Sequence, residues 1–99
     1  MNTEPKIPHL ASQALNSVME EMAAQDKKWG ADRDEHDLAF WHLILSEEVG
    51  EWAEAILHYR ADGPKKYGLR SEIVQVAAVA LQIIEDIDRS EYMETINDY

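Results

Sequence analysis

Apolar residues recur at intervals of three and four along most of the chain, which is the spacing of one face of an α-helix. This pattern predicts a first helix from about His9 to Trp29, a second from the N-cap Asp37 to Ala61, and a third from Leu69 to about Ile87. Ser90 is a suitable N-cap for a short final helix over Glu91 to Ile96. No segment has the alternation of a strand. The expected fold class is therefore all-α, a helical bundle of three main helices plus a short C-terminal helix.

The segments between the predicted helices contain residues that disfavour a helix. Gly30 is placed to end the first helix, and residues 31–36, rich in charge, are expected to form a loop. Asp62, Gly63 and Pro64 separate the second helix from the third, and a basic pair follows them. A loop of a few residues is therefore expected to join helices two and three.

The third predicted helix is apolar around most of its circumference. Ile73, Val76, Ile83 and Ile87 lie on one face, and Leu81 is among the residues that widen it. Two neighbouring helices cannot cover so wide a face. We therefore expect the bundle to be completed by oligomerisation, as a homodimer or homotetramer.

Length and charge limit the classes of partner. A chain of 99 residues predicts one domain, with residues 1–8 as a flexible lead-in to a single helical domain over residues 9–99. The 20 acidic and 9 basic side chains give a net charge of -11, which disfavours a nucleic acid polymer as partner. An acidic protein still binds a polyphosphate if its carboxylates hold divalent metal ions, because the ions reverse the local field.

The absence of cysteine and of long apolar runs bears on localisation. Without cysteine there is neither a disulfide framework nor a thiolate metal site, which is typical of a reducing compartment. No uninterrupted run of about 18 apolar residues occurs, and the N-terminal stretch lacks the apolar centre of a signal peptide. The sequence predicts a cytoplasmic protein without a membrane partner.

Several glutamates fall on the apolar side of the second predicted helix. On a projection of about 100° per residue, Glu48 falls between Ala55 and Trp41, in the middle of the apolar arc. Glu51 lies inside the same arc and Glu47 on its edge. A helix with only structural duties would place these carboxylates on its solvent side.

The third predicted helix repeats this arrangement, because Glu72 shares a sector with Val76, Val79 and Ile83. An unpaired carboxylate there costs several kcal/mol, roughly, unless a cation, a proton or hydrogen-bond donors compensate it. One alternative is that each glutamate pairs with a basic residue across the bundle. The other is a shared divalent ion, for which carboxylate oxygens without cysteine favour Mg²⁺ or Mn²⁺ over zinc.

These glutamates form a pair of motifs. Glu47, Glu48 and Glu51, within residues 46–55, resemble the EExxE motif of the MazG-like, all-α nucleoside triphosphate pyrophosphohydrolases, and residues 72–75 resemble their following ExxD motif. The resemblance covers roughly residues 29–87. Lys28-Trp29-Gly30 before the motifs and Gln75-Val76-Ala77-Ala78 after them are similar to a phage-like subgroup.

The resemblance implies a function and a set of site residues. It implies hydrolysis of nucleoside or deoxynucleoside triphosphates to monophosphate and pyrophosphate, in nucleotide-pool house-cleaning, with Mg²⁺ as cofactor and Mn²⁺ as a possible substitute. By motif, Glu48, Glu51 and Glu72 would be metal ligands, and Glu47 would hold a further ion or activate the water. Gln75 stands where the family has an aspartate, so it would offer a carbonyl oxygen but no charge.

Six further residues are candidates for contacting the substrate. Lys65, Lys66 and Arg70 cluster just before Glu72 and are placed to meet the outer phosphates, although solubilising loop charges explain them equally well. Lys28 and Trp29 offer an ammonium for phosphate and an indole for stacking, with core packing as the alternative for Trp29. The sixth candidate is His36, which precedes the second helix; its alternative is a solvated loop residue.

Two other functions remain open from the sequence. One is a non-catalytic helical module that binds a partner and has lost full metal binding, which Gln75 instead of aspartate would permit. The other is a carboxylate-bridged di-iron bundle, which requires Glu-x-x-His pairs that these glutamates do not form.

Overall fold

The computed structural model describes residues 9–29 and 37–97, which are almost entirely helical. The helices are α1 (Leu10–Trp29), α2 (Leu38–Arg60) and α3 (Leu69–Asn97), with a short 3₁₀ helix, η2 (Lys66–Gly68), leading into α3. No strand occurs within these two ranges. The prediction of an all-α chain with three main helices is confirmed, and the predicted bounds of the first two agree with the structure to within a residue.

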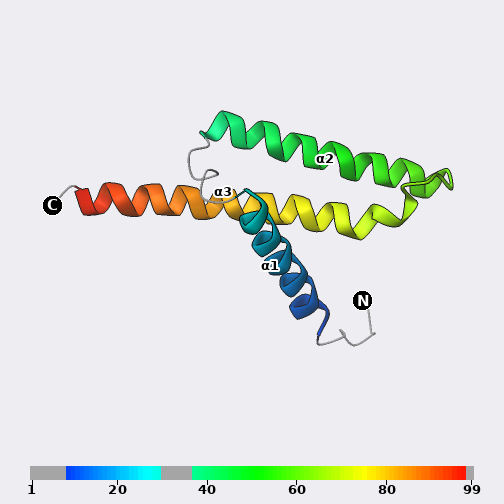
Figure 1. The fold of residues 1–99 in the computed structure, drawn as a ribbon, viewed down its shortest axis with the longest axis horizontal. Coiled ribbons are helices and arrows are strands. Elements are labelled where there is room, and N and C mark those ends of the chain that lie inside the picture. The colour runs from blue at the N-terminus through cyan, green and yellow to red at the C-terminus, as the bar shows by residue number, and fades with distance from the viewer. Residues whose placement is uncertain (1–8, 30–36, 98–99) are drawn as a thin grey trace, which may run out of the picture.

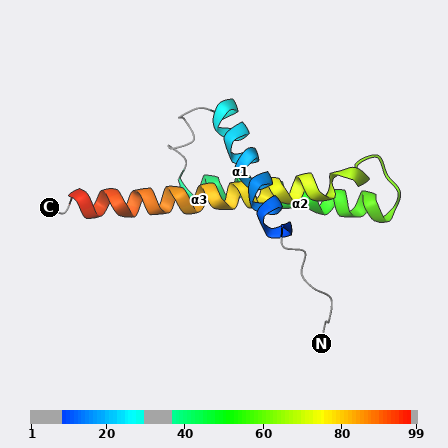
Figure 2. The same cartoon turned by 90° about the horizontal axis from the view of Figure 1, so that it is seen from below.

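α3 is the helix against which both others pack. α2 and α3 run side by side in opposite directions, joined by a tight turn, and α1 crosses α3 steeply near its middle (Figures 1 and 2). Arg70 of α3 is linked to α1, because its Nη2 donates to the Ser17 Oγ at 2.8 Å. The start of α3 therefore lies beside the end of α2, within reach of α1.

The beginning of α2 is fixed by a cap and by a buried tryptophan. The Asp37 side chain accepts a hydrogen bond of 2.8 Å from the Phe40 backbone N–H, as predicted for an N-cap. Trp41 is 4% exposed, and its Nε1 donates to Asp86 Oδ2 on α3 at 3.0 Å. Arg89 donates to the other oxygen of the same carboxylate at 3.2 Å. These contacts set the register of α2 against α3.

The turn after α2 is organised around His58. Asp62 adopts a left-handed conformation (φ 56°), and the Gly63 N–H donates to the His58 carbonyl at 2.7 Å, closing a Schellman-type helix end. The His58 ring Nδ1 accepts from the Lys65 N–H at 3.2 Å. A Cβ at Gly63 would lie 2.5 Å from that same Nδ1, so the turn requires glycine there. The backbone of Lys65 is held in place as a result.

α3 is longer than predicted. The sequence predicted an end near Ile87 and a separate short helix over Glu91 to Ile96 capped by Ser90, but α3 continues to Asn97 without a break. No glycine or proline follows Gly68 in this helix, so nothing in the chain stops it. Ser90 lies inside the helix with an exposed side chain.

The core of the single chain is small. Among the residues described, five apolar side chains are buried: Val18, Trp41, Ala55, Ala78 and Val79. Many large apolar side chains are exposed instead, including Leu15, Met19, Leu38, Leu43, Leu57, Tyr59, Tyr67 and Ile84. Isolated exposed apolar residues are normal on a protein surface. Here they are numerous, so the single chain leaves much of its apolar side-chain surface exposed.

One stretch, Lys66–Glu91, is long and apolar enough to cross a membrane by length and composition alone. This test does not separate a membrane span from a helix that packs inside a protein assembly, because both bury apolar side chains. The stretch also contains Glu72. An ionised carboxylate without a partner is energetically costly inside a membrane.

Three predictions concern residues outside the described ranges. These are the lead-in over residues 1–8, the role of Gly30 and the loop over residues 31–36.

Candidate metal centre

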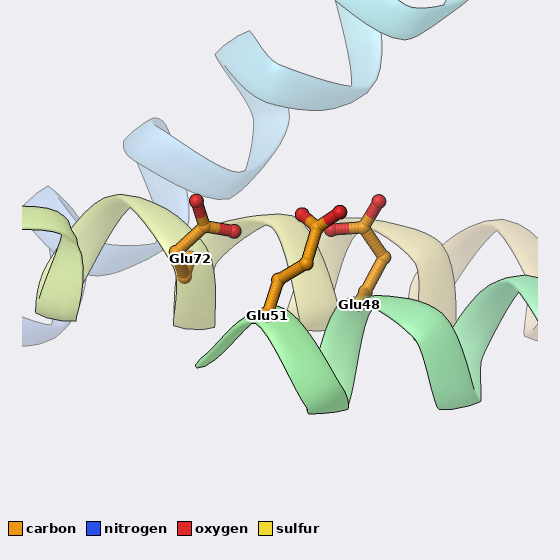
Figure 3. Close-up of side chains that lie close together, drawn as sticks. All are labelled: Glu48, Glu51 and Glu72. Carbon is orange, nitrogen blue, oxygen red and sulfur yellow. The ribbon is translucent and has the colours of Figure 1, made fainter. Parts of the chain in front are cut away.

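Three carboxylates meet between α2 and α3. Glu48 and Glu51 project from α2 and Glu72 projects from α3, and the three side chains lie together (Figure 3). One oxygen of each lies within 4.8 Å of the others, and all three residues are half-buried. We call this group the Glu48–Glu51–Glu72 cluster.

The helices explain why these three side chains meet. Glu48 and Glu51 are one turn apart on α2, and the buried residues Trp41 and Ala55 lie two turns before and after Glu48 on the same face. That face packs against α3. Glu72 lies in the first turn of α3, where the helix dipole favours negative charge.

The cluster is electrostatically unfavourable without a cation. Burial raises the pKa of Glu48, and the charges of Glu51, Glu72, Glu47 and Glu21 raise it further. Burial also raises the pKa of Glu72, with Glu51 as the next cause. Glu48 and Glu72 therefore hold their protons more tightly than ordinary glutamates do, because the pKa of each is raised.

Two carboxylate oxygens are also left without hydrogen-bond partners. Glu48 Oε2 and Glu72 Oε2 are both buried, and neither has a partner in the described part of the chain. An oxygen in this state costs free energy that a metal ion or a donor would recover.

The geometry of the cluster fits a divalent cation. Oxygens bound to one Mg²⁺ at about 2.1 Å lie about 3 Å apart when adjacent and about 4.2 Å apart when opposite. The separations of up to 4.8 Å in the cluster need only small side-chain adjustments to reach these values. If the cluster holds an ion, three carboxylates without histidine or cysteine would favour a hard cation such as Mg²⁺ or Mn²⁺.

An open pocket of about 440 Å³ adjoins the cluster on the side of Glu51 and Glu72. Its walls come from the end of α2, the turn and the start of α3: Glu51, Glu54, Ala55, Pro64, Lys65, Tyr67, Gly68 and Glu72. This volume lies within the usual range for small-molecule sites. The pocket thus combines an acidic wall with one lysine and one exposed tyrosine.

The other two predicted metal-site residues lie near the cluster. Glu47 is exposed and is not among the three converging carboxylates, although its charge reaches Glu48. Gln75 is half-buried and follows Glu72 by about one turn of α3, on the same side. Both roles stay predictions.

The predicted substrate-contacting residues are dispersed. Lys66 Nζ forms an ion pair with Asp62 and lies 5.1 Å from the centre of the Tyr67 ring, and Arg70 donates to Ser17. Neither of these two cations is among the residues lining the pocket.

Lys28 is exposed near the end of α1. The side chain of Trp29 and the whole of His36 lie outside the part of the chain that the structure describes.

Sequence reasoning assigned no role to three residues near the site and did not distinguish a fourth from its neighbours. Glu54 could have been found, because it follows Glu51 by one turn of α2. Lys65 was grouped with its neighbours, and only the turn geometry singles it out. Tyr67 lines the pocket and Glu21 of α1 acts on Glu48, but no spacing in the sequence indicates either.

Comparison with known proteins adds no identification. No family model matches the chain, and no curated protein or solved structure matches it significantly.

Proposed function

We propose that this protein is a magnesium-dependent nucleoside triphosphate pyrophosphohydrolase, which cleaves the bond between the α and β phosphates. One observation supports it above all: Glu48, Glu51 and Glu72 converge from two helices, with a buried oxygen on Glu48 and on Glu72 that has no partner in the described residues. The spacing of the same glutamates resembles the two motifs of the MazG-like family. Clearance of unwanted nucleotides is the role that this resemblance suggests.

The proposed chemistry asks little of the protein beyond positioning and charge. Glu48, Glu51 and Glu72 would hold the cation, and Gln75 would add a neutral oxygen. When bound, the ion supplies positive charge to the phosphates and lowers the pKa of a water molecule. Mn²⁺ would substitute for Mg²⁺, since both are bound by carboxylate oxygens.

In the reaction, a water oxygen bonds to the α phosphorus and the bond from that phosphorus to the bridging oxygen breaks. Pyrophosphate leaves with the bonding electrons, and nucleoside monophosphate remains. Glu47, exposed next to Glu48, would accept the proton of the water, the role that the family resemblance implies.

We also propose that the active form is a homodimer or homotetramer in the cytoplasm. Exposed apolar side chains on each helix support this, such as Met19 on α1, Leu43 on α2 and Ile84 on α3. A second copy would cover them without requiring a membrane or a nucleic acid.

The reaction is tested by incubating the purified protein with each common dNTP and NTP, in Mg²⁺ and in EDTA. The expected result is equal release of monophosphate and pyrophosphate in Mg²⁺ and none in EDTA. Release of inorganic phosphate instead would show cleavage at another bond and would contradict the proposal.

The same experiment separates the proposal from the non-catalytic module, which Gln75 in place of an aspartate favours. A module that has lost its metal would release nothing in Mg²⁺ or Mn²⁺. It would also gain no thermal stability from either ion, because only an ion that binds the folded state stabilises it.

A further inference from the structure

Lys65, Lys66 and Arg70 lie close together in sequence, in the turn after α2 and at the start of α3, but their side chains contact different groups. Lys66 Nζ pairs with Asp62, and Arg70 Nη2 donates to Ser17 on α1. Lys65 Nζ donates to Glu54 Oε1 at 2.7 Å. Of the three, only Lys65 lines the pocket beside the Glu48–Glu51–Glu72 cluster.

Lys65 shares one electrostatic environment with the cluster. Its pKa is raised, first by the hydrogen bond and charge of Glu54 and then by the charges of Glu51 and Glu72. Glu51 and Glu72 also line the pocket with it. A polyphosphate whose first phosphate binds an ion at the cluster would therefore extend its remaining phosphates towards Lys65.

The backbone of Lys65 is fixed while its side chain is free to exchange partners. The Lys65 N–H is held by the His58 ring at 3.2 Å, in a turn closed by Gly63. The Lys65 side chain is 62% exposed and that of Glu54 is 45% exposed. Exposed ion pairs contribute little to stability, so a phosphate that carries more charge than Glu54 would displace it.

We propose that Lys65 binds the phosphates beyond the metal-bound one, and that Glu54 is its partner only when the pocket is empty. This inference rests on the proposed function, because the cluster must hold a cation to attract a polyphosphate. It identifies the ligand class as a nucleotide with one or more phosphates beyond the metal-bound one. It also narrows to Lys65 the contact that the sequence had given to Lys65, Lys66 and Arg70 together.

The test measures binding by calorimetry of three probes in turn: Mn²⁺ alone, an α,β-methylene deoxynucleoside triphosphate with Mg²⁺, and the matching monophosphate with Mg²⁺. Lys65→Gln is compared with Lys66→Gln, its sequence neighbour outside the pocket. We expect Lys65→Gln to weaken the triphosphate analogue about tenfold or more, as loss of a charged hydrogen bond does. Its affinities for Mn²⁺ and for the monophosphate should not fall, and Lys66→Gln should change all three less than about twofold.

A second variant tests the exchange of partners. Glu54→Gln should strengthen binding of the triphosphate analogue, and this gain should disappear in the double variant Glu54→Gln/Lys65→Gln. Lys65→Arg should restore most of the affinity that Lys65→Gln loses. Circular dichroism establishes that each variant keeps its helical content.

The outcomes separate this inference from the proposed function. If the wild-type protein binds Mn²⁺ but Lys65→Gln and Lys66→Gln behave alike towards the triphosphate analogue, the inference is wrong and the metal centre stands. If the wild-type protein binds no Mn²⁺, the proposed function is wrong and the inference is wrong with it.

Discussion

Replacing Glu72 with glutamine is expected to stabilise the metal-free protein at neutral pH and to abolish its stabilisation by magnesium. Burial, and after it the neighbouring Glu51, raises the pKa of Glu72 above the ordinary 4.5. A carboxyl group with a raised pKa binds its proton more tightly in the folded state than in the unfolded state. Its stabilising contribution is therefore complete below pH 4.5 and is lost as the pH rises through the folded-state pKa.

The size of the effect follows from the separation of the carboxylates, which is at most 4.8 Å between the nearest oxygens. Two unit charges at that distance repel by about 1 kcal/mol in water and by about 3.5 kcal/mol at an effective dielectric constant of 20. Because the side chains are half-buried, the lower part of this range applies. Glu72→Gln should raise the free energy of unfolding by about 1–2 kcal/mol at pH 7 in EDTA.

Magnesium should remove most of this difference in stability. At about ten times its Kd, an ion that binds only the folded state adds about 1.4 kcal/mol. In a domain of this size that is a rise in Tm of roughly 6–11 °C. The wild-type protein should show this rise, and Glu72→Gln should not.

The assay is thermal unfolding followed by circular dichroism between pH 5 and pH 8, with EDTA and with Mg²⁺. Glu85→Gln is the matched control, because Glu85 is exposed on the same helix and is not among the clustered carboxylates. In EDTA the wild-type Tm should fall with rising pH, more steeply than that of Glu72→Gln. Lower stability of Glu72→Gln than of the wild-type protein in EDTA, or equal stabilisation of both by Mg²⁺, would show that Glu72 does not belong to a repulsive cluster that binds the ion.

Two further predictions concern the turn and the core. Gly63→Ala should lower the free energy of unfolding by about 1–3 kcal/mol in urea, because its Cβ would displace the His58 ring that holds Lys65; unchanged stability would show that the ring does not order the turn. Gln82→Met should raise the free energy of unfolding by about 1 kcal/mol, since Gln82 is 5% exposed and its Nε2 has no partner among the described residues. A loss of stability in Gln82→Met would instead indicate that the amide is hydrogen-bonded in solution, for example to a second copy.

Local signals in the sequence were sufficient for the first two helices and for the start of the third. The Asp37 side chain identifies the start of α2 because an N-cap hydrogen bond forms within one helical turn. Asp62, Gly63 and Pro64 identify the end of α2, because a helix end is also set by residues within about one turn. The prediction of a helix start at Ser90 was wrong because serine is common both as an N-cap and on an exposed helix face. Only the surrounding chain decides between those two uses.

The candidate site could be predicted from the sequence only in part. The angular positions of Glu48 and Glu51 on the predicted helix were enough to place both residues on the face that packs against α3. The direction in which the Lys65 side chain points could not be predicted from the sequence, because it depends on the left-handed conformation of Asp62 and on the His58 ring. A run of basic residues in a turn does not reveal which of them faces the pocket.

The most direct test of the metal-dependent hydrolysis is the turnover of a nucleoside triphosphate by Glu48→Gln, with Glu85→Gln as control. Pyrophosphate and monophosphate are measured in Mg²⁺, and helical content and oligomeric state are checked for each variant. Metal-dependent hydrolysis at this cluster predicts that Glu48→Gln stays folded and loses at least about 99% of the turnover, while Glu85→Gln keeps the wild-type rate. Turnover by a folded Glu48→Gln variant at the wild-type rate would contradict it.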